Sequence, residues 1–277
     1  MKRNLGKFVW QNKEAAKRWK SSFEKDMVAK YWDAFEREAI FDFSNTLKED
    51  MIKDLIIDVG CGQGKYFRYF NDSSLKVGGD VSIEMLRICK EDFPGVKCVV
   101  LEGESLPFKD ESFDIVLCTR TLQHIKNQKL FLEELTRITS PQGHILLLFY
   151  NALTPHCLYK NICNRGIMIS IYNKLPKLLQ KAWLFRPWPL EYDNYSTLFE
   201  VKNILRKNTV QVRRIRGVTL GFTWIFMYLP PFKLFRRKTP KVVSVYLKIC
   251  EKLERVIRDK FPFYLIMDKV LVHATKK

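Results

Sequence analysis

A glycine-rich turn with two nearby carboxylates is the part of this sequence best suited to hold a small ligand. The turn is Asp58-Val59-Gly60-Cys61-Gly62-Gln63-Gly64, directly after an apolar run and before a stretch suited to a helix. Glycines let the chain turn tightly and let a ligand approach the backbone closely. The start of a helix would add free amide donors. An acidic residue two positions before the first glycine fits a cationic amino-acid group better than a pyrophosphate.

Asp80 is the second carboxylate, 22 residues after Asp58 and at the end of the next apolar run. A carboxylate at that place can accept hydrogen bonds from both hydroxyls of a ribose, as it does in dinucleotide enzymes. The dinucleotide pattern G-x-G-x-x-G, however, requires glycine at position 65, where this chain has lysine. The glycine spacing therefore argues against a dinucleotide cofactor.

Short apolar runs and amphipathic stretches predict the elements that must position these residues. Strands that alternate with helices at this spacing imply parallel βαβ units, with ligands bound at the carboxyl ends of the strands. The expected strands are residues 55–59, 76–80, 97–101, 113–118, 144–150, 210–215 and 268–275. The expected helices are residues 65–70, a helix capped by Ser82, 127–139, 197–207 and 241–260.

Two of these helices carry more specific signals. Thr197 and Glu200 form a capping box, which marks the start of a helix. The helix over 241–260 is amphipathic, with five of its apolar residues on one stripe. The stripe consists of Val242, Tyr246, Ile249, Leu253 and Val256.

Five motifs in the first half resemble those of one family. In chain order they are D-x-G-C-G-x-G at 58–64, G-x-D-x-S-x-x-M-L at 78–86, an acidic pair before L-P-F at 102–108, S-F-D at 112–114 and the turn Pro141-Gln142-Gly143. The set is similar to the class I S-adenosylmethionine-dependent methyltransferases, in particular the group that acts on small molecules. The match spans residues 54–150. It implies an enzyme with S-adenosyl-L-methionine as its cofactor.

The resemblance also implies a fold and a division of the chain. The fold is α/β, a doubly wound, mostly parallel seven-stranded sheet of the Rossmann-like methyltransferase type with helical cap insertions. The last two strands, about 209–216 and 268–275, would pair antiparallel. The expected parts are an N-terminal helical cap (1–50), a cofactor-binding α/β core (51–150), a helical, basic cap or substrate region (151–208), and the closing strands (209–277) with a helical insertion at 217–265.

Individual roles follow from the resemblance by position. Asp58 would contact the methionine amino end of the cofactor, and Asp80 would bind its ribose. Glu102 and Gly103 would bind the adenine, although the family more often has Asp-Ala there. The cofactor-binding set that the resemblance implies is Asp58, Gly60, Cys61, Gly62, Gly64, Asp80, Val81, Met85, Glu102, Gly103 and Thr119.

One histidine lies where a catalytic base is plausible. His124 follows the fourth expected strand, and an imidazole there could take a proton from an acceptor hydroxyl or amine. The alternative is a hydrogen-bonded structural histidine. Thr119, nearer that strand, would face the methionine or the acceptor, while Val81 and Met85 would pack on the adenine. Methyl transfer from a sulfonium needs no protein nucleophile, because alignment can supply most of the rate.

The cysteines and the apolar runs bear on metal binding and location. Seven cysteines occur and none forms a CxxC pair, so the spacing of zinc fingers and disulfide scaffolds is missing. We expect no metal, and reduced, mostly buried thiols in a cytoplasmic protein. The first 50 residues carry no secretory signal. The longest run without charge, Gly217–Phe232, has 16 residues, fewer than the roughly 20 that a spanning helix needs.

Charge is distributed unevenly between the two halves. Residues 1–150 contain 23 Lys or Arg and 23 Asp or Glu, whereas residues 151–277 contain 25 and 7. The whole net charge of +18 therefore belongs to the second half. That half should meet an anionic partner: a phosphate-bearing substrate, a nucleic acid or a membrane surface.

Three functions remain open from the sequence. The first is methylation of a small-molecule or lipid-like acceptor, taken at an anionic membrane through Gly217–Phe232 and the cations that follow it; a buried cap is the alternative for that run. The second is RNA methylation, in which basic and aromatic residues would track phosphates and stack bases. The third is a non-catalytic cofactor-binding protein. The methylated atom and the oligomeric state are left open.

Overall fold

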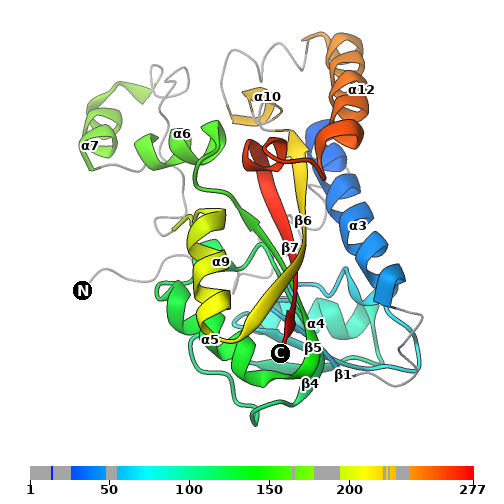
Figure 1. The fold of residues 1–277 in the computed structure, drawn as a ribbon. Helices are drawn as coiled ribbons and strands as arrows, with labels where there is room; N and C mark the ends of the chain where they lie inside the picture. The colour runs from blue at the N-terminus through cyan, green and yellow to red at the C-terminus, as the bar shows by residue number, and fades with distance from the viewer. Residues whose placement is uncertain are drawn as a thin grey trace.

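The computed structural model describes residues 14, 26–47, 55–163, 166–177, 194–220, 223, 225–228 and 238–277. The strands are β1 (Leu55–Val59), β2 (Leu75–Asp80), β3 (Lys97–Val100), β4 (Phe113–Thr119), β5 (Thr139–Tyr150), β6 (Val210–Leu220) and β7 (Met267–Lys276), as Figure 1 shows. The α-helices are α3 (Met27–Leu47), α4 (Ile83–Asp92), α5 (Gln128–Ile138), α6 (Pro155–Cys163), α7 (Gly166–Lys174), α9 (Leu198–Lys207), α10 (Ile225–Tyr228) and α12 (Pro240–Ile257). Short 3-10 helices are η1 (Phe67–Tyr69), η2 (Leu122–His124) and η3 (Phe263–Leu265).

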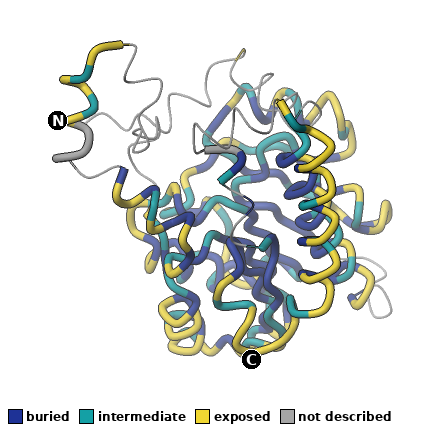
Figure 2. Tube along the Cα trace, turned by 90° about the horizontal axis from the view of Figure 1, so that it is seen from above, coloured by how far each residue is buried: buried dark blue, intermediate teal, exposed yellow. Residues whose placement is uncertain are grey.

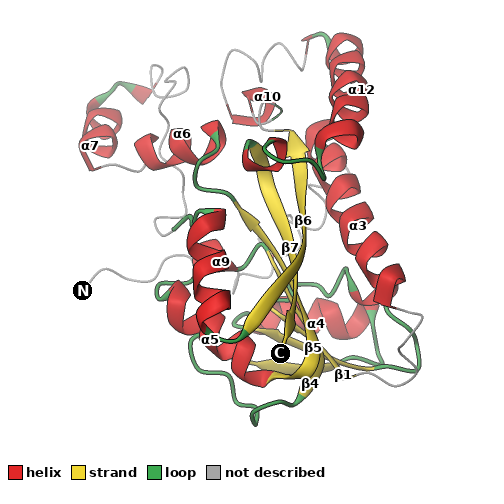
Figure 3. Cartoon of the chain, viewed as in Figure 1, coloured by secondary structure: helices red, strands yellow, loops and turns green. Residues whose placement is uncertain are grey.

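The seven described strands form one sheet in the order β3-β2-β1-β4-β5-β7-β6 (Figure 3). Four pairs are parallel: β1 with β2, β1 with β4, β2 with β3, and β4 with β5. β7 runs antiparallel to both of its neighbours, β5 and β6. The expected seven-stranded, mostly parallel α/β sheet is confirmed, and so is the antiparallel pairing of the last two strands.

Helices cover both faces of the sheet because its strands are apolar on both sides. In β1, Ile56 packs in the apolar cluster that includes α3, whereas Ile57 packs in the cluster that includes α5 and α9. Ser82 caps α4 and the box of Thr197 and Glu200 caps α9, both as predicted. Figure 2 shows buried residues gathered in the strands and exposed residues along the outer sides of the helices.

The described part of the predicted N-terminal cap is the single long helix α3. Tyr31, Trp32 and Phe35 are buried in its contact with the sheet, so this helix contributes to the core. Trp10, Trp19 and Phe23, which belong to the same expected cap, lie outside the described residues.

The helix expected over residues 65–70 is wrong in type and length. The chain forms only the 3-10 turn η1 there. Its two neighbouring aromatic residues explain this, because Tyr66 packs in the cluster of α3 while Phe67 packs in a separate cluster with α4. Tertiary contacts on opposite sides of the segment therefore override a continuing α-helix.

The expected turn Pro141-Gln142-Gly143 lies inside β5. The pairing of β5 with β4 jumps from Phe113–Thr139 to Ile115–His144, and Gln142 has a φ of 61°. The three residues thus form a bulge in a strand that begins earlier than residue 144.

The helical insertion expected from residue 217 begins later, because β6 continues to Leu220. Val218 and Thr219 are buried strand residues, and Val218 and Leu220 pair with β7. Thr223 and Phe226, further along the same chargeless run, are also buried. The described part of Gly217–Phe232 is therefore mostly core, and the expectation that this run docks on a membrane is wrong for those residues.

The stripe named from the sequence is not the face that α12 buries. The buried residues of α12 are Val243, Leu247, Cys250 and Glu254. Four members of the expected stripe, Val242, Ile249, Leu253 and Val256, are exposed, and Tyr246 is half-buried.

Several sequence expectations fall outside the described residues. They include the breaks at Pro187 and Pro189, and the cations Lys233, Arg236 and Arg237. Within the part of the chain that the structure describes, no helix is long and apolar enough to cross a membrane.

Candidate functional site

Gly60 fixes the geometry of the glycine turn at the carboxyl end of β1. Its φ is 79°, and a Cβ there would lie 2.0 Å from the side-chain oxygen of Thr121. Thr121 in turn donates a hydrogen bond to the Gly60 carbonyl at 3.3 Å. Because a side chain fits neither the conformation nor the space, glycine at this position brings the turn against the end of β4.

Asp80 holds the other side of the same turn. Its two carboxylate oxygens accept hydrogen bonds from the backbone N–H groups of Gly62 at 2.9 Å and Ser82 at 2.8 Å. Burial raises the pKa of Asp80, and these amide donors partly offset that effect. The carboxylate is thereby fixed at the carboxyl end of β2, where the predicted ribose contact requires it.

Asp58 has a different environment from that of Asp80. It is fully buried, and neither of its carboxylate oxygens has a hydrogen-bond partner among the described residues. Burial raises the pKa of Asp58 to about 7, with a further increase from Asp80 and a decrease from Lys65. A buried carboxylate without a donor is costly, so this position fits a cationic ligand group such as the amino group of S-adenosylmethionine.

The remaining glycine-turn residues lie beside a small cluster of thiols. Gly64 has a φ of 72°, and a Cβ there would lie 2.5 Å from the sulfur of Cys89. Cys61 is buried in the same cluster with Phe67. All seven cysteines are free; six are buried and Cys98 is half-buried, which agrees with the expectation of reduced, mostly buried thiols.

The predicted adenine contacts lie at the ends of β2 and β3, on the same edge of the sheet. Met85 is buried, Val81 is half-buried and the side chain of Glu102 is exposed. A Cβ on Gly103 would lie 2.7 Å from the ring of Phe131, so packing also requires glycine there. These adenine roles stay predictions.

Thr119 is the last residue of β4, and His124 lies a few residues beyond it. Thr119 is buried, and its carbonyl accepts a hydrogen bond from Thr121. His124 is exposed, lies 3.2 Å from the side chain of Gln123, and is close enough to Asp80 for its charge to lower the pKa of that carboxyl. The structure thus brings His124 near the predicted cofactor carboxylates, and its catalytic role stays a prediction.

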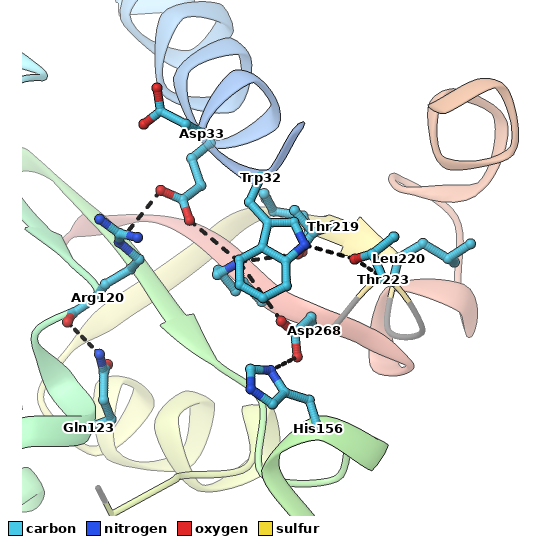
Figure 4. A network of polar contacts seen from close by, with 12 residues as sticks. Trp32, Asp33, Arg120, Gln123, His156, Thr219, Leu220, Thr223 and Asp268 are labelled. Atoms are coloured by element: carbon cyan, nitrogen blue, oxygen red, sulfur yellow. Dashed lines mark hydrogen bonds and ion pairs between the residues drawn. The ribbon is translucent and has the colours of Figure 1, made fainter. Parts of the chain in front are cut away.

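A buried polar cluster that the sequence did not indicate lies under α3 (Figure 4). The Glu36 carboxylate contacts Lys65 at 3.2 Å, the Tyr66 hydroxyl at 3.1 Å, Arg120 at 3.5 Å and Lys269 at 3.4 Å. Burial alone would raise the pKa of Glu36, but these cations hold it below its usual range. Nothing in the sequence marks Glu36, because its partners come from distant segments.

Arg120 connects this cluster to the predicted cofactor site. It directly follows Thr119 at the carboxyl end of β4 and has a φ of 56°. A left-handed backbone is uncommon outside glycine and recurs at functional sites. The cluster therefore adjoins the edge of the sheet at which the cofactor residues converge.

A second missed group is the pair His156 and Asp268. His156 Nδ1 and an Asp268 oxygen are 2.7 Å apart, and both side chains are buried. Burial lowers the pKa of His156 while Asp268 opposes that shift, and the same pairing holds the pKa of Asp268 below its usual value. His156 lies in α6, which follows β5, and Asp268 is the second residue of β7, so only the pairing of β5 with β7 brings them together.

Comparison with known proteins covers both the core and the whole chain. The model of a methyltransferase domain matches residues 57–147. The uncharacterized protein MJ0638 of Methanocaldococcus jannaschii is 32% identical over 235 residues, which is 84% of this chain and 87% of that protein. The similarity therefore extends well beyond the motifs.

Relatives with named activities match mainly the core. The ubiquinone/menaquinone biosynthesis C-methyltransferase of Campylobacter jejuni is 30% identical over 105 residues, 35% of this chain and 45% of that protein. The tRNA (carboxymethyluridine(34)-5-O)-methyltransferase of Arabidopsis thaliana is 32% identical over 101 residues, 35% of this chain and 24% of that protein. Another relative, the uncharacterized protein MJ1123 of M. jannaschii, is 34% identical over 44% of this chain and 58% of its own length.

A solved structure supports the fold over nearly the full length. The magnesium protoporphyrin IX methyltransferase of Synechocystis PCC 6803, solved with bound SAH, superposes with a TM-score of 0.61 over 99% of both chains at 11% identity. The match of the methyltransferase domain and the similarity to named methyltransferases agree with the order of the sheet. The chain belongs to the class I S-adenosylmethionine-dependent methyltransferases.

Proposed function

We propose that the chain methylates a small, lipid-like acceptor that carries an anionic or otherwise polar group. The single observation that carries the cofactor half of the proposal is the buried Asp58 carboxylate without a hydrogen-bond partner among the described residues, because it fits the cationic end of the cofactor. S-adenosylmethionine, when bound, supplies an electrophilic sulfonium methyl group. Asp58 would hold its amino group and Asp80 its ribose at the edge formed by β1, β2 and β4.

Aromatic rings and buried ammonium groups next to this edge favour such an acceptor. Lys269 lies 4.5 Å from the ring of Trp32 and 5.1 Å from that of Tyr150. Lys160 lies 5.2 Å from Tyr150 and 5.7 Å from Tyr195. Both lysines are almost fully buried. Lys269 is already paired with Glu36 and Asp268, so the aromatic rings, more than its charge, favour a flat or apolar molecule that carries a polar group.

His156 would receive the proton that leaves a hydroxyl acceptor. Its pKa is below the usual value, so the imidazole is neutral and able to accept near pH 7. Asp268 fixes the ring and would stabilise the imidazolium that forms. His124 remains the alternative base. The pH profile of kcat in His156→Asn and in His124→Asn distinguishes these two candidates, because only loss of the true base removes its titration from the profile.

RNA is the weaker acceptor candidate. Of the arginines on β6, Arg216 is 3% exposed and is paired with Asp42 and Asp259, and Arg214 also pairs with Asp259. Arg213 is exposed and donates a hydrogen bond to Thr275. All three arginines therefore have partners within the protein and do not form a free row for phosphates. The quinone methyltransferase among the relatives supports the lipid-like acceptor, while the tRNA methyltransferase keeps RNA in the test.

Calorimetric titration with S-adenosylmethionine and S-adenosylhomocysteine tests the cofactor half of the proposal. We expect micromolar binding that is lost in Asp80→Ala, weakened in Asp58→Asn and kept in Asp72→Asn, an exposed control carboxylate. No binding to the well-folded wild type would overturn it.

Methyl transfer from labelled cofactor to a lipid extract and to total RNA tests the acceptor half. Incorporation into the lipid fraction supports the proposal, and incorporation into RNA alone overturns it. Cofactor binding without turnover on either pool supports the non-catalytic alternative instead.

A further inference from the structure

α12 exposes a continuous apolar stripe that the site does not use. Its members are spaced three or four residues apart, which places them on one side of a helix. They are each between 50% and 59% exposed: Val242, Val245, Ile249, Leu253 and Val256.

The side of α12 that faces the protein is fixed independently of this stripe. The buried Glu254 carboxylate accepts hydrogen bonds from the backbone N–H groups of Thr219 at 2.6 Å and Leu220 at 3.0 Å, and from the Tyr31 hydroxyl at 2.9 Å. Arg255 pairs with Glu38 of α3 at 2.6 Å. These anchors to β6 and α3 prevent a rotation that would bury the stripe.

A row of cations lies beside the stripe. Lys241, Lys248 and Lys252 are exposed, and their spacing at about 100° per residue puts them on the arc next to the apolar one. The sequence just before the helix adds Lys233, Arg236, Arg237 and Lys238. An exposed apolar arc bordered by lysines is the pattern of helices that lie in a membrane interface.

We propose that α12 docks the enzyme on an anionic lipid bilayer, with the stripe in the interface and the lysines against the headgroups. Charge complementarity favours this occupant, since each cation near an anionic surface strengthens binding. A second copy fits less well, because two-fold packing of the stripes would bring the lysine rows close together. Protein interface cores are also depleted of lysine.

The position of α12 in the fold links the proposed docking to the cofactor site. Figure 1 shows α12 at the end of the molecule where β5 and β6 finish, together with α6 and α10. That is the carboxyl edge of the parallel strands, at which the cofactor residues converge. Docking there would place the site near a lipid-like acceptor, and in this respect the inference rests on the proposed function.

Co-sedimentation with vesicles tests the docking without cofactor or acceptor. We expect the wild-type chain to bind phosphatidylglycerol-containing vesicles and not phosphatidylcholine vesicles, with an affinity that falls as salt rises. Ile249→Asn/Leu253→Asn and Lys248→Gln/Lys252→Gln should each weaken binding roughly tenfold or more. Phe199→Asn, at an exposed apolar residue of α9, is the matched control and should bind like the wild type.

Three results would overturn the inference. They are a wild type that ignores anionic vesicles at low salt, an Ile249→Asn/Leu253→Asn variant that binds as the wild type does, and a lipid-free dimer that this variant abolishes. The last result would assign the stripe to a second copy. If the chain binds vesicles but methylates no lipid, the proposed acceptor is wrong and the docking proposal stands. If it methylates lipid in detergent but does not bind vesicles, the docking proposal is wrong and the proposed acceptor stands.

Discussion

At the scale of single residues, the two carboxylates of the cofactor edge have opposite environments. Asp80 accepts hydrogen bonds from two backbone amides, so it is already fixed. Asp58 is buried without such donors among the described residues. A positive ligand group would therefore gain most from Asp58, while Asp80 is positioned to contact a neutral hydroxyl.

This contrast predicts how cofactor affinity depends on pH. Burial raises the pKa of Asp58 to about 7, so below that pH the carboxyl is protonated and must release a proton when a cation binds. We expect the affinity for S-adenosylmethionine to fall by up to roughly tenfold per pH unit below about pH 7. Above roughly pH 8 the amino group of the ligand loses its own charge, so affinity should peak between these values.

Calorimetry in buffers of different ionisation enthalpy measures this proton release directly. Asp58→Asn should bind weakly and show no fall on the acid side, whereas Asp72→Asn should keep the wild-type profile. An acid-side fall that persists in Asp58→Asn would assign the titration to another group.

Two glycines of the turn should differ in how much their substitution lowers the free energy of unfolding. Gly60 and Gly62 both have positive φ, but only at Gly60 would a Cβ collide with a neighbour, Thr121. We expect Gly62→Ala to lower the free energy of unfolding by about 1–2 kcal/mol and Gly60→Ala by clearly more. Urea unfolding of the cofactor-free variants checks this, and equal costs would show that the turn can move away from Thr121.

At the scale of elements, a buried acid rather than apolar periodicity decides which way α12 faces. Tyr246 is half-buried and the other four residues of the expected stripe lie outside, because Glu254 must reach the backbone of β6. A buried acceptor of three hydrogen bonds is costly to displace, whereas apolar side chains tolerate partial exposure. Hydrophobic pattern alone therefore does not show which face of α12 packs against the core.

Glu254 also predicts a dependence of stability on pH. Burial raises its pKa from 4.5 to about 7, with hydrogen bonds from Thr219, Tyr31 and Leu220 acting in the opposite direction. The folded chain then holds this proton more tightly than the unfolded chain, so the stabilisation is complete below pH 4.5 and is lost as pH rises through about 7. The loss is at most roughly 1.4 kcal/mol per pH unit.

Urea unfolding of Glu254→Gln across pH 4.5–8 measures this contribution. The variant should be less stable than the wild type at pH 5 by about 1–3 kcal/mol, and the gap should narrow toward pH 7. Asp58 titrates in both proteins and cancels in the comparison. Glu251→Gln, at a half-buried position of the same helix, should follow the wild type, and a constant gap for Glu254→Gln would contradict the linkage.

At the scale of the whole molecule, β7 joins the two halves of the chain. It lies between β5 and β6 and pairs with both along most of its length. Its Val270 and Val272 are buried in the same cluster as residues of β5 and α5. The first half of the chain, which has no net charge, and the basic second half thus share one core.

Truncation tests this dependence. A fragment of residues 1–208 lacks β6 and β7 and leaves the apolar edge of β5 unpaired, so we expect no cooperative unfolding and no cofactor binding. Circular dichroism during urea unfolding and calorimetry measure both. A fragment that unfolds cooperatively and binds the cofactor would show that residues 1–208 fold independently of β6 and β7.

The sequence by itself determined the sheet, the glycine turn and the positions of Asp58 and Asp80, because these depend on local periodicity and on motifs a few residues long. It could not indicate the Glu36 cluster, the pair of His156 and Asp268, or the exposed stripe of α12. Those features join residues from separate elements, between 29 and more than 200 positions apart in the chain, or depend on one buried acid that fixes a helix face. Only the tertiary structure decides which distant polar groups share the interior and which apolar residues stay in solvent.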